Sequence, residues 1–291
     1  MLGYFIMSTD QIISRRSFIF CPGLRPDMFP KALSSGTDIV CVELEDGIAP
    51  KDKDEARKLA LDLFSEGLNN DGVEKIVRIN CVRDQFGLAD IQAILNTNSP
   101  PPGIMLPKVK TPDEVKWVDD LLSERGHITR LHVIIETNAG LEAVYDIAKA
   151  SERIDALFFG GVDMAAELRC QNAWEPLLYA RSRVAHAAAG ANLDVIDVPY
   201  LDLDDLAGMK LEAELVRDLG FSGKGCIHPK QIQTINDVFT PDSETIADAE
   251  RIIKAFREAG TGLVVIDGKL IEKPVLRHME RIMAIAKRVG K

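Results

Sequence analysis

The hydrophobic positions of this chain fall into short apolar runs, each followed by a turn and then by a longer segment with helical spacing. Most of the runs lack polar alternation, which indicates strands that are buried on both faces of a parallel sheet. Eight strand–helix units predict a (β/α)8 TIM barrel, and an open doubly wound sheet is the alternative. The predicted strands are residues 17–20, 39–43, 76–79, 104–106, 132–135, 156–159, 194–198 and 225–227.

The segments between the strands carry helix signals. Proline stands at the start of the segments that begin at Pro26 and Pro229, and residues 111–114 resemble a capping box with proline in the first turn. Residues 51–64 are predicted to form a helix whose charged face includes Lys53. The other helices are predicted at residues 26–34, 115–122, 176–189, 209–219 and 229–238.

The chain continues past the eighth unit for about fifty residues, which is more than a barrel needs. Helices are predicted at residues 243–259 and 273–288, with a short apolar run at 262–266 and a turn between them. We therefore expect a loose N-terminal extension (residues 1–14), a barrel (residues 15–240) and a helical C-terminal extension (residues 241–291). The last segment is expected to pack on the barrel or on a neighbouring subunit.

Composition and charge narrow the functional classes. Of the 291 residues, 46% are hydrophobic, as in globular proteins with a large core. The formal net charge of −10 disfavours binding to nucleic acid or to an anionic membrane. No apolar run reaches the roughly eighteen residues that span a membrane. The five cysteines lack CxxC spacing, which indicates free thiols in a reducing cytoplasm rather than a zinc site.

Sequence motifs exclude several common enzyme types. The chain contains no GxGxxG, no GxxxxGK[ST] and no GxSxG. A dehydrogenase, a P-loop enzyme and a serine hydrolase of the usual kind are therefore disfavoured. The first residues are apolar but lack a basic segment, so we do not expect a signal peptide.

Acidic residues stand at the ends of two neighbouring predicted strands. Glu136 directly follows the run 132–135, and Asp163 comes shortly after the run 156–159. The carboxyl ends of barrel strands form the face where ligands bind. Carboxylates without a nearby Cys/His cluster suit a hard cation such as Mg²⁺. We therefore predict that Glu136 and Asp163 are Mg²⁺ ligands, with two solvated loop acids as the alternative.

Other strand ends carry both signs of charge. Glu45 and Asp46 follow the second strand and either orient metal-bound waters or cap the next helix. Arg78 ends the third strand, and its guanidinium suits a carboxylate or a developing enolate oxygen, or else an ion pair with one of the acids. Lys108 follows the fourth strand. A Schiff base there is the alternative to polarisation of the substrate by a metal ion.

Three further residues lie near the same end of the predicted sheet. Arg25 and Lys31 flank the start of the first helix, where they either hold phosphates, such as those of coenzyme A, or are ordinary solvated surface groups. His228 precedes Pro229, and we interpret it as a structural residue rather than as a base.

These strand-end residues belong to a set of motifs that resembles a known family. The chain is similar to the citrate lyase β-subunit-like group of the HpcH/HpaI aldolase superfamily, which includes malyl-CoA and citramalyl-CoA lyases. The resemblance runs from about residue 15 to about residue 287. Its motifs are residues 18–26, 42–46, 77–80, 106–108, 135–137, 159–163, 177–183, 227–231 and 235–241.

The resemblance implies a Mg²⁺-dependent aldol or retro-aldol enzyme that acts on a 3-hydroxyacyl-CoA thioester. Glu136 and Asp163 fall on the family's metal ligands, and Arg78 falls on the residue that stabilises the enolate of the acyl-CoA. Arg25 and Lys31 fall on positions that contact the phosphates of coenzyme A. The implied assembly is a homotrimer or a hexamer.

Within that assembly, the family's C-terminal segment reaches over the active site of a neighbour. Phe20 lies beside the implied coenzyme A pocket. Many malyl-CoA lyases carry an acid/base aspartate in a stretch that corresponds to residues 268–275, whereas this chain has Glu272 there. Glutamate is one methylene longer, and an error of about 1 Å in position can cost roughly a hundredfold in rate.

Three other functions stay open from the sequence. The same site is compatible with a thioesterase that hydrolyses the CoA ester. A free-acid aldolase that uses pyruvate without coenzyme A would not need Arg25 or Lys31. A third alternative is a non-catalytic subunit that depends on a partner protein, like the β-chain of a multi-subunit lyase.

Overall fold

The computed structural model describes residues 14–65, 72–260 and 262–291. The chain divides into a larger unit, Arg15–Phe239, and a smaller unit that contains Thr240–Lys291. Residues 1–13 of the predicted N-terminal extension lie outside the described part. No helix among the described residues is long and apolar enough to cross a membrane.

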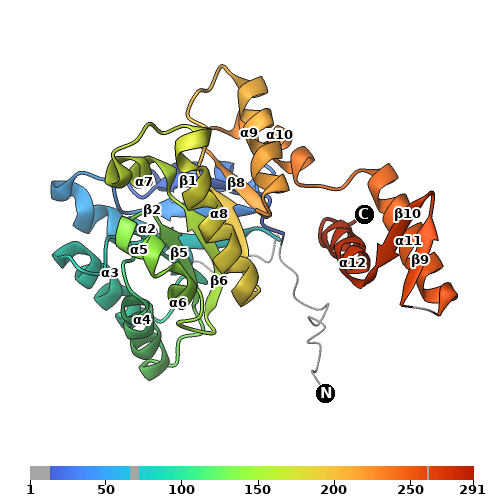
Figure 1. The fold of residues 1–291 in the computed structure, drawn as a ribbon. Helices are drawn as coiled ribbons and strands as arrows, with labels where there is room; N and C mark the ends of the chain where they lie inside the picture. The colour runs from blue at the N-terminus through green and yellow to red at the C-terminus, as the bar shows by residue number, and fades with distance from the viewer. Residues whose placement is uncertain (1–13, 66–71, 261) are drawn as a thin grey trace. The chain divides into compact units, whose positions relative to one another are not determined.

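The larger unit is a closed barrel of parallel strands with helices around it, so the predicted (β/α)8 TIM barrel with a helical C-terminal part is confirmed (Figure 1). Each strand pairs with the next one in the chain, and β8 pairs with β1. The strands of the described barrel are β1 (Ser17–Pro22), β2 (Ile39–Glu43), β3 (Glu74–Arg78), β4 (Gly103–Leu106), β5 (Arg130–Ile135), β6 (Ile154–Phe159), β7 (Asp194–Asp197) and β8 (Gly223–Cys226).

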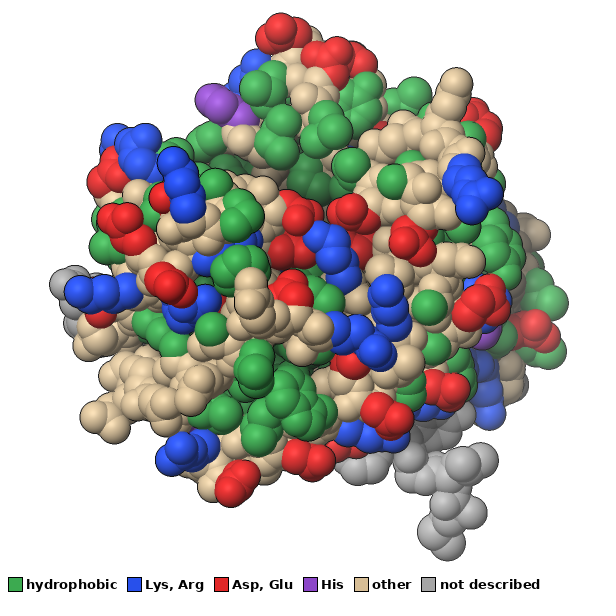
Figure 2. Space-filling view, turned by 90° about the vertical axis from the view of Figure 1, so that its left-hand side faces the viewer, with side chains coloured by type: hydrophobic (Ala, Val, Ile, Leu, Met, Phe, Trp, Pro, Cys, Tyr) green, Lys and Arg blue, Asp and Glu red, His purple; other side chains and the backbone are tan. Residues whose placement is uncertain are grey.

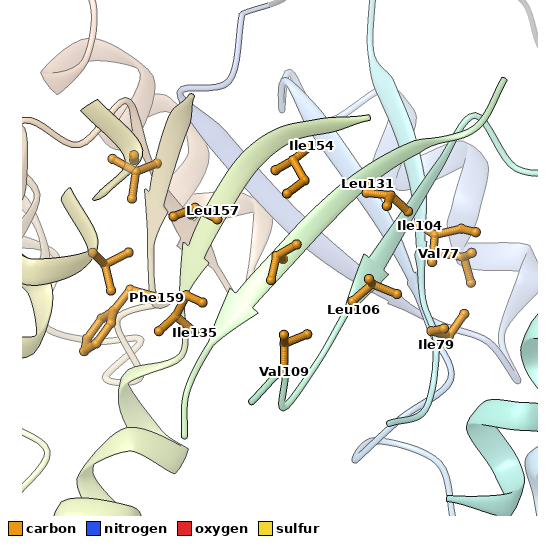
Figure 3. Packing of buried hydrophobic residues seen from close by; sticks show 14 of the residues in the cluster. Val77, Ile79, Ile104, Leu106, Val109, Leu131, Ile135, Ile154, Leu157 and Phe159 are labelled. Atoms are coloured by element: carbon orange, nitrogen blue, oxygen red, sulfur yellow. The ribbon is translucent and has the colours of Figure 1, made fainter. Parts of the chain in front are cut away.

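Side chains alternate along each strand between two hydrophobic layers. One set, which includes Val77, Leu131 and Ile135, packs between the strands and the helices (Figure 3). The other set, which includes Ile76 and Ile134, forms a separate cluster inside the barrel. Because the strands are buried on both faces, their apolar runs show no polar alternation in the sequence.

The helices follow the predicted order, with local differences. The predicted helix 26–34 is divided, because Pro30 has no N–H to donate to the carbonyl of Pro26, which Phe29 takes instead. The described barrel helices are η2 (Pro26–Met28), α1 (Phe29–Leu33), η3 (Pro50–Asp52), α2 (Lys53–Ser65), α3 (Gln85–Asn96), α4 (Pro112–Glu124), α5 (Asn138–Glu142), α6 (Val144–Ile147), α7 (Gly161–Leu168), α8 (Trp174–Ala191), α9 (Leu206–Asp218), η4 (Pro229–Gln231) and α10 (Ile232–Val238).

The predicted capping box at the start of α4 is wrong in its chemistry. Thr111 occupies the N-cap position, but its side chain makes no capping hydrogen bond. The carboxylate of Glu114 accepts from the backbone N–H of Lys110 at 3.1 Å and pairs with Arg83. The ion pair with Arg83 therefore competes for the carboxylate that a capping box would use.

The smaller unit contains two helices and a hairpin: α11 (Ser243–Ala259), β9 (Leu263–Ile266), β10 (Lys269–Glu272) and α12 (Lys273–Arg288). Ile252, Phe256 and Ile271 form its buried core. Asp267 and Gly268 both have positive φ, as a two-residue turn between antiparallel strands requires. The sequence predicted this turn and the apolar run before it, but not the strand β10.

A partly buried ion-pair cluster closes the amino-terminal end of the barrel. Arg15 contacts Glu74 at 2.7 Å, Asp194 at 3.0 Å and Asp155 at 3.1 Å. Nε2 of the fully buried His132 lies 3.0 Å from Glu74. Glu74, His132 and Asp155 are grouped closely enough to hold a cation. Arg15, however, already bonds both of the carboxylates, so the protein itself supplies the positive charge.

Candidate active site

A mainly apolar pocket of about 220 Å³ opens at the carboxyl ends of the barrel strands. Of the residues singled out from the sequence, Phe20, Arg78, Glu136 and Asp163 line it. In Figure 2, acidic and basic side chains gather around a hollow on this face of the molecule. The remaining wall is built largely from Phe18, Met105, Ile134, Phe158, Phe159, Val198, Leu201 and Ile227.

Strand register brings Arg78 to the rim of this pocket. Arg78 and Glu43 are paired positions of β3 and β2, and Arg78 Nε lies 2.5 Å from a carboxylate oxygen of Glu43. The guanidinium lies 4.5 Å from the ring centre of Phe20, in a cation–π contact. Burial alone would lower the pKa of Arg78, but Glu43 and Glu45 raise it above its usual value. Arg78 is therefore a fixed cation, and it forms the ion pair that was predicted as its alternative role.

Glu136 is more deeply buried than Asp163, the other predicted metal ligand. It follows β5, is 3% exposed, and accepts a 2.8 Å hydrogen bond from the backbone N–H of Lys108 through Oε1. Gly160 leaves room for this side chain, because a Cβ there would collide with the Glu136 carboxylate. Burial, and then the charges of Glu45 and Asp163, raises the pKa of Glu136 to about 8.

Asp163 lies half-buried in the first turn of α7, where the helix dipole favours a negative charge. Its carboxylate makes no hydrogen bond or ion pair with any residue in the described part of the chain. The second carboxylate oxygen of Glu136 likewise has no hydrogen-bond partner among the described residues. Both groups line the same pocket.

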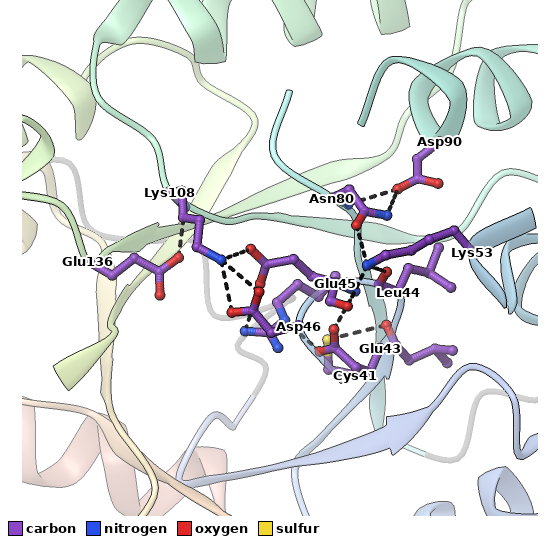
Figure 4. A network of polar contacts seen from close by, with 12 residues as sticks. Cys41, Glu43, Leu44, Glu45, Asp46, Lys53, Asn80, Asp90, Lys108 and Glu136 are labelled. Atoms are coloured by element: carbon purple, nitrogen blue, oxygen red, sulfur yellow. Dashed lines mark hydrogen bonds and ion pairs between the residues drawn. The ribbon is translucent and has the colours of Figure 1, made fainter. Parts of the chain in front are cut away.

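The acids that follow β2 are held by cations. Nζ of Lys108 lies 2.5 Å from Glu45 and 2.9 Å from both carboxylate oxygens of Asp46 (Figure 4). The other oxygen of Glu45 lies 3.2 Å from Nη1 of Arg78. Burial alone would lower the pKa of Lys108, but the hydrogen bonds to Glu45 and Asp46 raise it. An ammonium held in this way is unsuited to form a Schiff base.

The sequence predicted Lys53 on the charged face of a helix, whereas in the structure its side chain is buried. Its Nζ donates to the carbonyls of Leu44 at 2.8 Å and Glu45 at 2.6 Å, and to the side chain of Asn80 at 2.6 Å. Asn80 in turn is held by Asp90. This network fixes the loop that carries Glu45. A helical pattern could not reveal it, because Lys53 is the first residue of α2 and its partners lie in the segments that follow β2 and β3.

A further acid at a strand end was missed from the sequence. Asp197 ends β7, lines the pocket, and is 1% exposed. It pairs with Lys224 at 2.6 Å and with Arg181 at 2.9 Å, and both of these cations are fully or almost fully buried. The signal was the same as for Glu136, namely a carboxylate at the end of an apolar run. Its cations come from β8 and α8, which no local pattern links to it.

The remaining candidate residues lie away from the lining of the pocket. Arg25 and Lys31 are exposed, and Arg25 pairs with Asp27 at 2.8 Å. His228 accepts from the backbone N–H of Lys230 at 3.1 Å through Nδ1, which agrees with the structural role expected for it. Glu272 is exposed at the end of β10, in the smaller unit.

The acids at this end of the described barrel therefore fall into two groups. Glu43, Glu45, Asp46 and Asp197 are each paired with Arg or Lys side chains. Glu136 and Asp163 have no such partner among the described residues, and each contributes to a local excess of negative charge. A divalent cation between them would favour the ionised form of Glu136, and carboxylate oxygens are the ligands that Mg²⁺ prefers.

Comparisons with known proteins give a consistent result. The family model described as HpcH/HpaI aldolase/citrate lyase matches residues 16–229. The mitochondrial citramalyl-CoA lyase of Homo sapiens is 31% identical over 98% of this chain and 89% of that protein. The citrate lyase subunit beta of Haemophilus influenzae is 30% identical over 94% of this chain and 97% of that protein.

A solved structure of the CitE protein from Mycobacterium tuberculosis, in complex with magnesium, acetoacetate and coenzyme A, matches with a TM-score of 0.79. The two chains are 27% identical, and the match covers 94% of this chain and 98% of the other.

Proposed function

Because this chain belongs to the HpcH/HpaI aldolase/citrate lyase family and is a lyase as its relatives are, we propose that its substrate is a 3-hydroxyacyl-CoA thioester. The family resemblance seen in the sequence is confirmed by the family model and by both relatives. The proposed reaction breaks or forms a carbon–carbon bond in malyl-CoA or citramalyl-CoA, with glyoxylate or pyruvate as the second product.

One observation carries the assignment of the site: Glu136 and Asp163 are the acids of the pocket without a cationic partner among the described residues. We propose that they hold Mg²⁺, the ion present in the matched CitE complex. When bound there, Mg²⁺ would act as a Lewis acid on the oxygens of the oxo-acid part of the substrate.

The protein's own residues supply the remaining chemistry. In the cleavage direction a base takes the proton of the substrate hydroxyl, its oxygen becomes a carbonyl, and the electron pair of the carbon–carbon bond passes into the thioester enolate. Arg78 is a permanent cation at the rim of the pocket and stabilises the negative charge of that enolate. The enolate carbon then takes a proton from Glu272, which we propose reaches the site from a neighbouring subunit of a homotrimer or hexamer.

Coenzyme A is proposed to bind beside Phe20, with its phosphates near Arg25 and Lys31. Both cations are exposed, and the ion pair that engages Arg25 is a surface pair that a phosphate can replace at low cost. This part of the proposal predicts that truncating either cation weakens the binding of CoA esters and leaves the metal site intact.

The test is to incubate the full-length protein with Mg²⁺ and either malyl-CoA or citramalyl-CoA, and to resolve the thioesters and acids by chromatography and mass. We expect acetyl-CoA and an equimolar amount of glyoxylate or pyruvate, with no product in EDTA. Free CoA together with an intact hydroxy acid would show a thioesterase and contradict the proposal.

A second candidate, a subunit that works only with a partner, is favoured by the similarity to citrate lyase subunit beta, which is almost as high as that to citramalyl-CoA lyase. The purified chain alone would then turn over neither ester. Activity would appear only when a partner that carries the acyl group is added, which the same assay detects.

A further inference from the structure

The backbone of Lys108 is unusual for a residue with a side chain. Its φ is 54°, in the left-handed region, which costs on the order of 1 kcal/mol for a residue other than glycine. Of the other non-glycine residues with positive φ in the described chain, Arg169 and Asn192 end helices and Asp267 lies in a hairpin turn. Lys108 instead lies two residues after the end of β4, at the carboxyl end of the barrel, so neither a helix end nor a hairpin explains its conformation.

In this conformation the backbone of Lys108 binds one acid, and its side chain binds two others. The backbone N–H of Lys108 donates to Glu136 at 2.8 Å, while its Nζ bonds Glu45 at 2.5 Å and Asp46 at 2.9 Å. In the view of Figure 4, the ammonium lies between the carboxylate of Glu136 on one side and those of Glu45 and Asp46 on the other. Lys108 thus separates the proposed metal ligand from two further acids of the same wall.

The separation matters because additional carboxylates on the metal would occupy the coordination positions that the substrate needs. Mg²⁺ takes six oxygens in near-octahedral geometry, and a catalytic site must leave positions for substrate. Glu136, Asp163, Glu45 and Asp46 together could fill most of the shell. We propose that Lys108 is a positioning residue that holds Glu45 and Asp46 away from the metal, so that only Glu136 and Asp163 bind it and substrate can enter.

This inference rests on the proposed function, because it assumes the Mg²⁺ site. It makes an unusual prediction for Lys108→Met, which keeps the length of the side chain and removes the charge. With the cation gone, Glu45 and Asp46 are released towards the metal. Mg²⁺ should then bind about tenfold more tightly, while kcat falls by about a hundredfold, in the range seen when residues that orient metal ligands are changed. A variant that is merely damaged would lose both properties.

The measurement is a calorimetric titration of metal-free protein with MgCl₂ at constant pH, beside the kcat and KM of the lyase assay. Lys110→Met is the matched control: Lys110 is exposed on the same loop, and its removal should change neither quantity. In Lys108→Arg a cation is kept, and Mg²⁺ affinity should return to within about threefold of wild type. The triple variant Lys108→Met/Glu45→Gln/Asp46→Asn should lose the excess affinity, because the released acids are gone.

The outcomes distinguish a failure of the proposed function from a failure of the inference about Lys108. Wild-type protein that binds no Mg²⁺ would overturn the proposed function, and this inference with it. Wild-type protein that binds Mg²⁺ while Lys108→Met binds it equally or more weakly would overturn the inference alone. If Lys108→Met does not fold, as judged by circular dichroism, Glu45→Gln/Asp46→Asn on the wild-type background decides. The inference expects Mg²⁺ affinity within about twofold of wild type, and a tenfold loss would show that these acids are ligands.

Discussion

The two ends of the barrel use the same residue types in opposite ways. At the amino-terminal end, Arg15 bonds Glu74, Asp155 and Asp194, so every one of these acids has a cation. At the carboxyl end, the cations are distributed so that Glu136 and Asp163 receive none from the described residues. The first arrangement stabilises the fold, whereas the second leaves a concentration of negative charge that a metal ion can relieve.

The pKa values express the same contrast. Burial alone would raise the pKa of Glu74, but His132 and Arg15 hold it well below its usual range. Burial also raises the pKa of Glu136, and the neighbouring Glu45 and Asp163 add to the effect, bringing it to about 8. The pKa values of these two carboxyl groups therefore shift in opposite directions, and the sign depends on whether the neighbours are cations or acids. Carboxylates without a cationic partner among the described residues therefore distinguish the end of the barrel that carries the proposed site.

The largest expected effect comes from removing one unpaired acid. Asp163→Asn keeps the shape of the side chain but weakens a metal ligand, so lyase activity should fall by about a thousandfold, which corresponds to about 4 kcal/mol of transition-state stabilisation. Its thermal midpoint should not fall, because the wild-type carboxylate has no partner to lose among the residues that the structure describes. Assays of acyl-CoA formation and a thermal melt measure the two quantities. Asp155→Asn, at the other end, is the matched control, and its folded protein should keep wild-type kcat.

The converse effect is expected at the amino-terminal end. Arg15→Met leaves three carboxylates without their shared cation, and we expect a loss of about 3–5 kcal/mol in the free energy of unfolding. Urea denaturation of the metal-free protein measures it. The exposed Lys116→Met, which breaks only a surface pair with Asp113, should stay within about 0.5 kcal/mol. A loss of kcat in folded Arg15→Met would show that the two ends are not independent.

The pH dependence of stability should separate the two ends. The folded pKa of Glu136 is about 8, above the usual value of 4.5 for a glutamate, so the folded state binds the proton more tightly. In metal-free protein, its contribution to stability is present below about pH 4.5 and is lost as the pH rises towards 8, at up to about 1.4 kcal/mol per pH unit. Urea midpoints between pH 5 and about 8.5 measure this slope.

Glu136→Gln should flatten that slope. An unchanged slope would show that the pH dependence of stability does not come from the raised pKa of Glu136. Glu74 has the opposite sign. Its folded pKa is lowered, so its contribution to stability is present above the usual glutamate value of 4.5 and is lost only as the pH falls through the folded pKa. Glu74→Gln should therefore lower stability throughout the neutral range without changing its slope there.

The smallest effect is expected outside both clusters. Arg25→Ala removes an exposed cation whose ion pair with Asp27 contributes little to stability. If it contacts a phosphate of coenzyme A, KM for the thioester should rise by about tenfold, as for one charge-assisted hydrogen bond, with kcat unchanged. Steady-state kinetics measure this, with Lys58→Ala as a surface control. Unchanged kinetics would favour a free-acid aldolase.

The sequence was most informative where a residue's role follows from its own strand. The positions of Arg78 and Glu136 could be predicted, because an apolar run that stops at a charged residue places that charge at the edge of the sheet. In a barrel, the carboxyl ends of all the strands then lie on one face. The strands themselves were predicted to within a few residues for the same reason. Asp197 could have been predicted in the same way, because β7, like the run that precedes Glu136, leads from apolar residues to a carboxylate.

What only the tertiary structure decided is which charges are paired. Lys53 was expected on the charged face of a helix, yet it is buried against the loop of Glu45 and against Asn80, 27 residues away in the chain. Lys108 contacts acids in the loop that follows β2, and Asp197 contacts cations from β8 and α8, all through contacts between distant segments. The sequence determined the barrel and the acids at its carboxyl end, because both depend on local periodicity. The pairing of those acids depends on distances between strands and helices far apart in the chain, and only the folded barrel sets those distances.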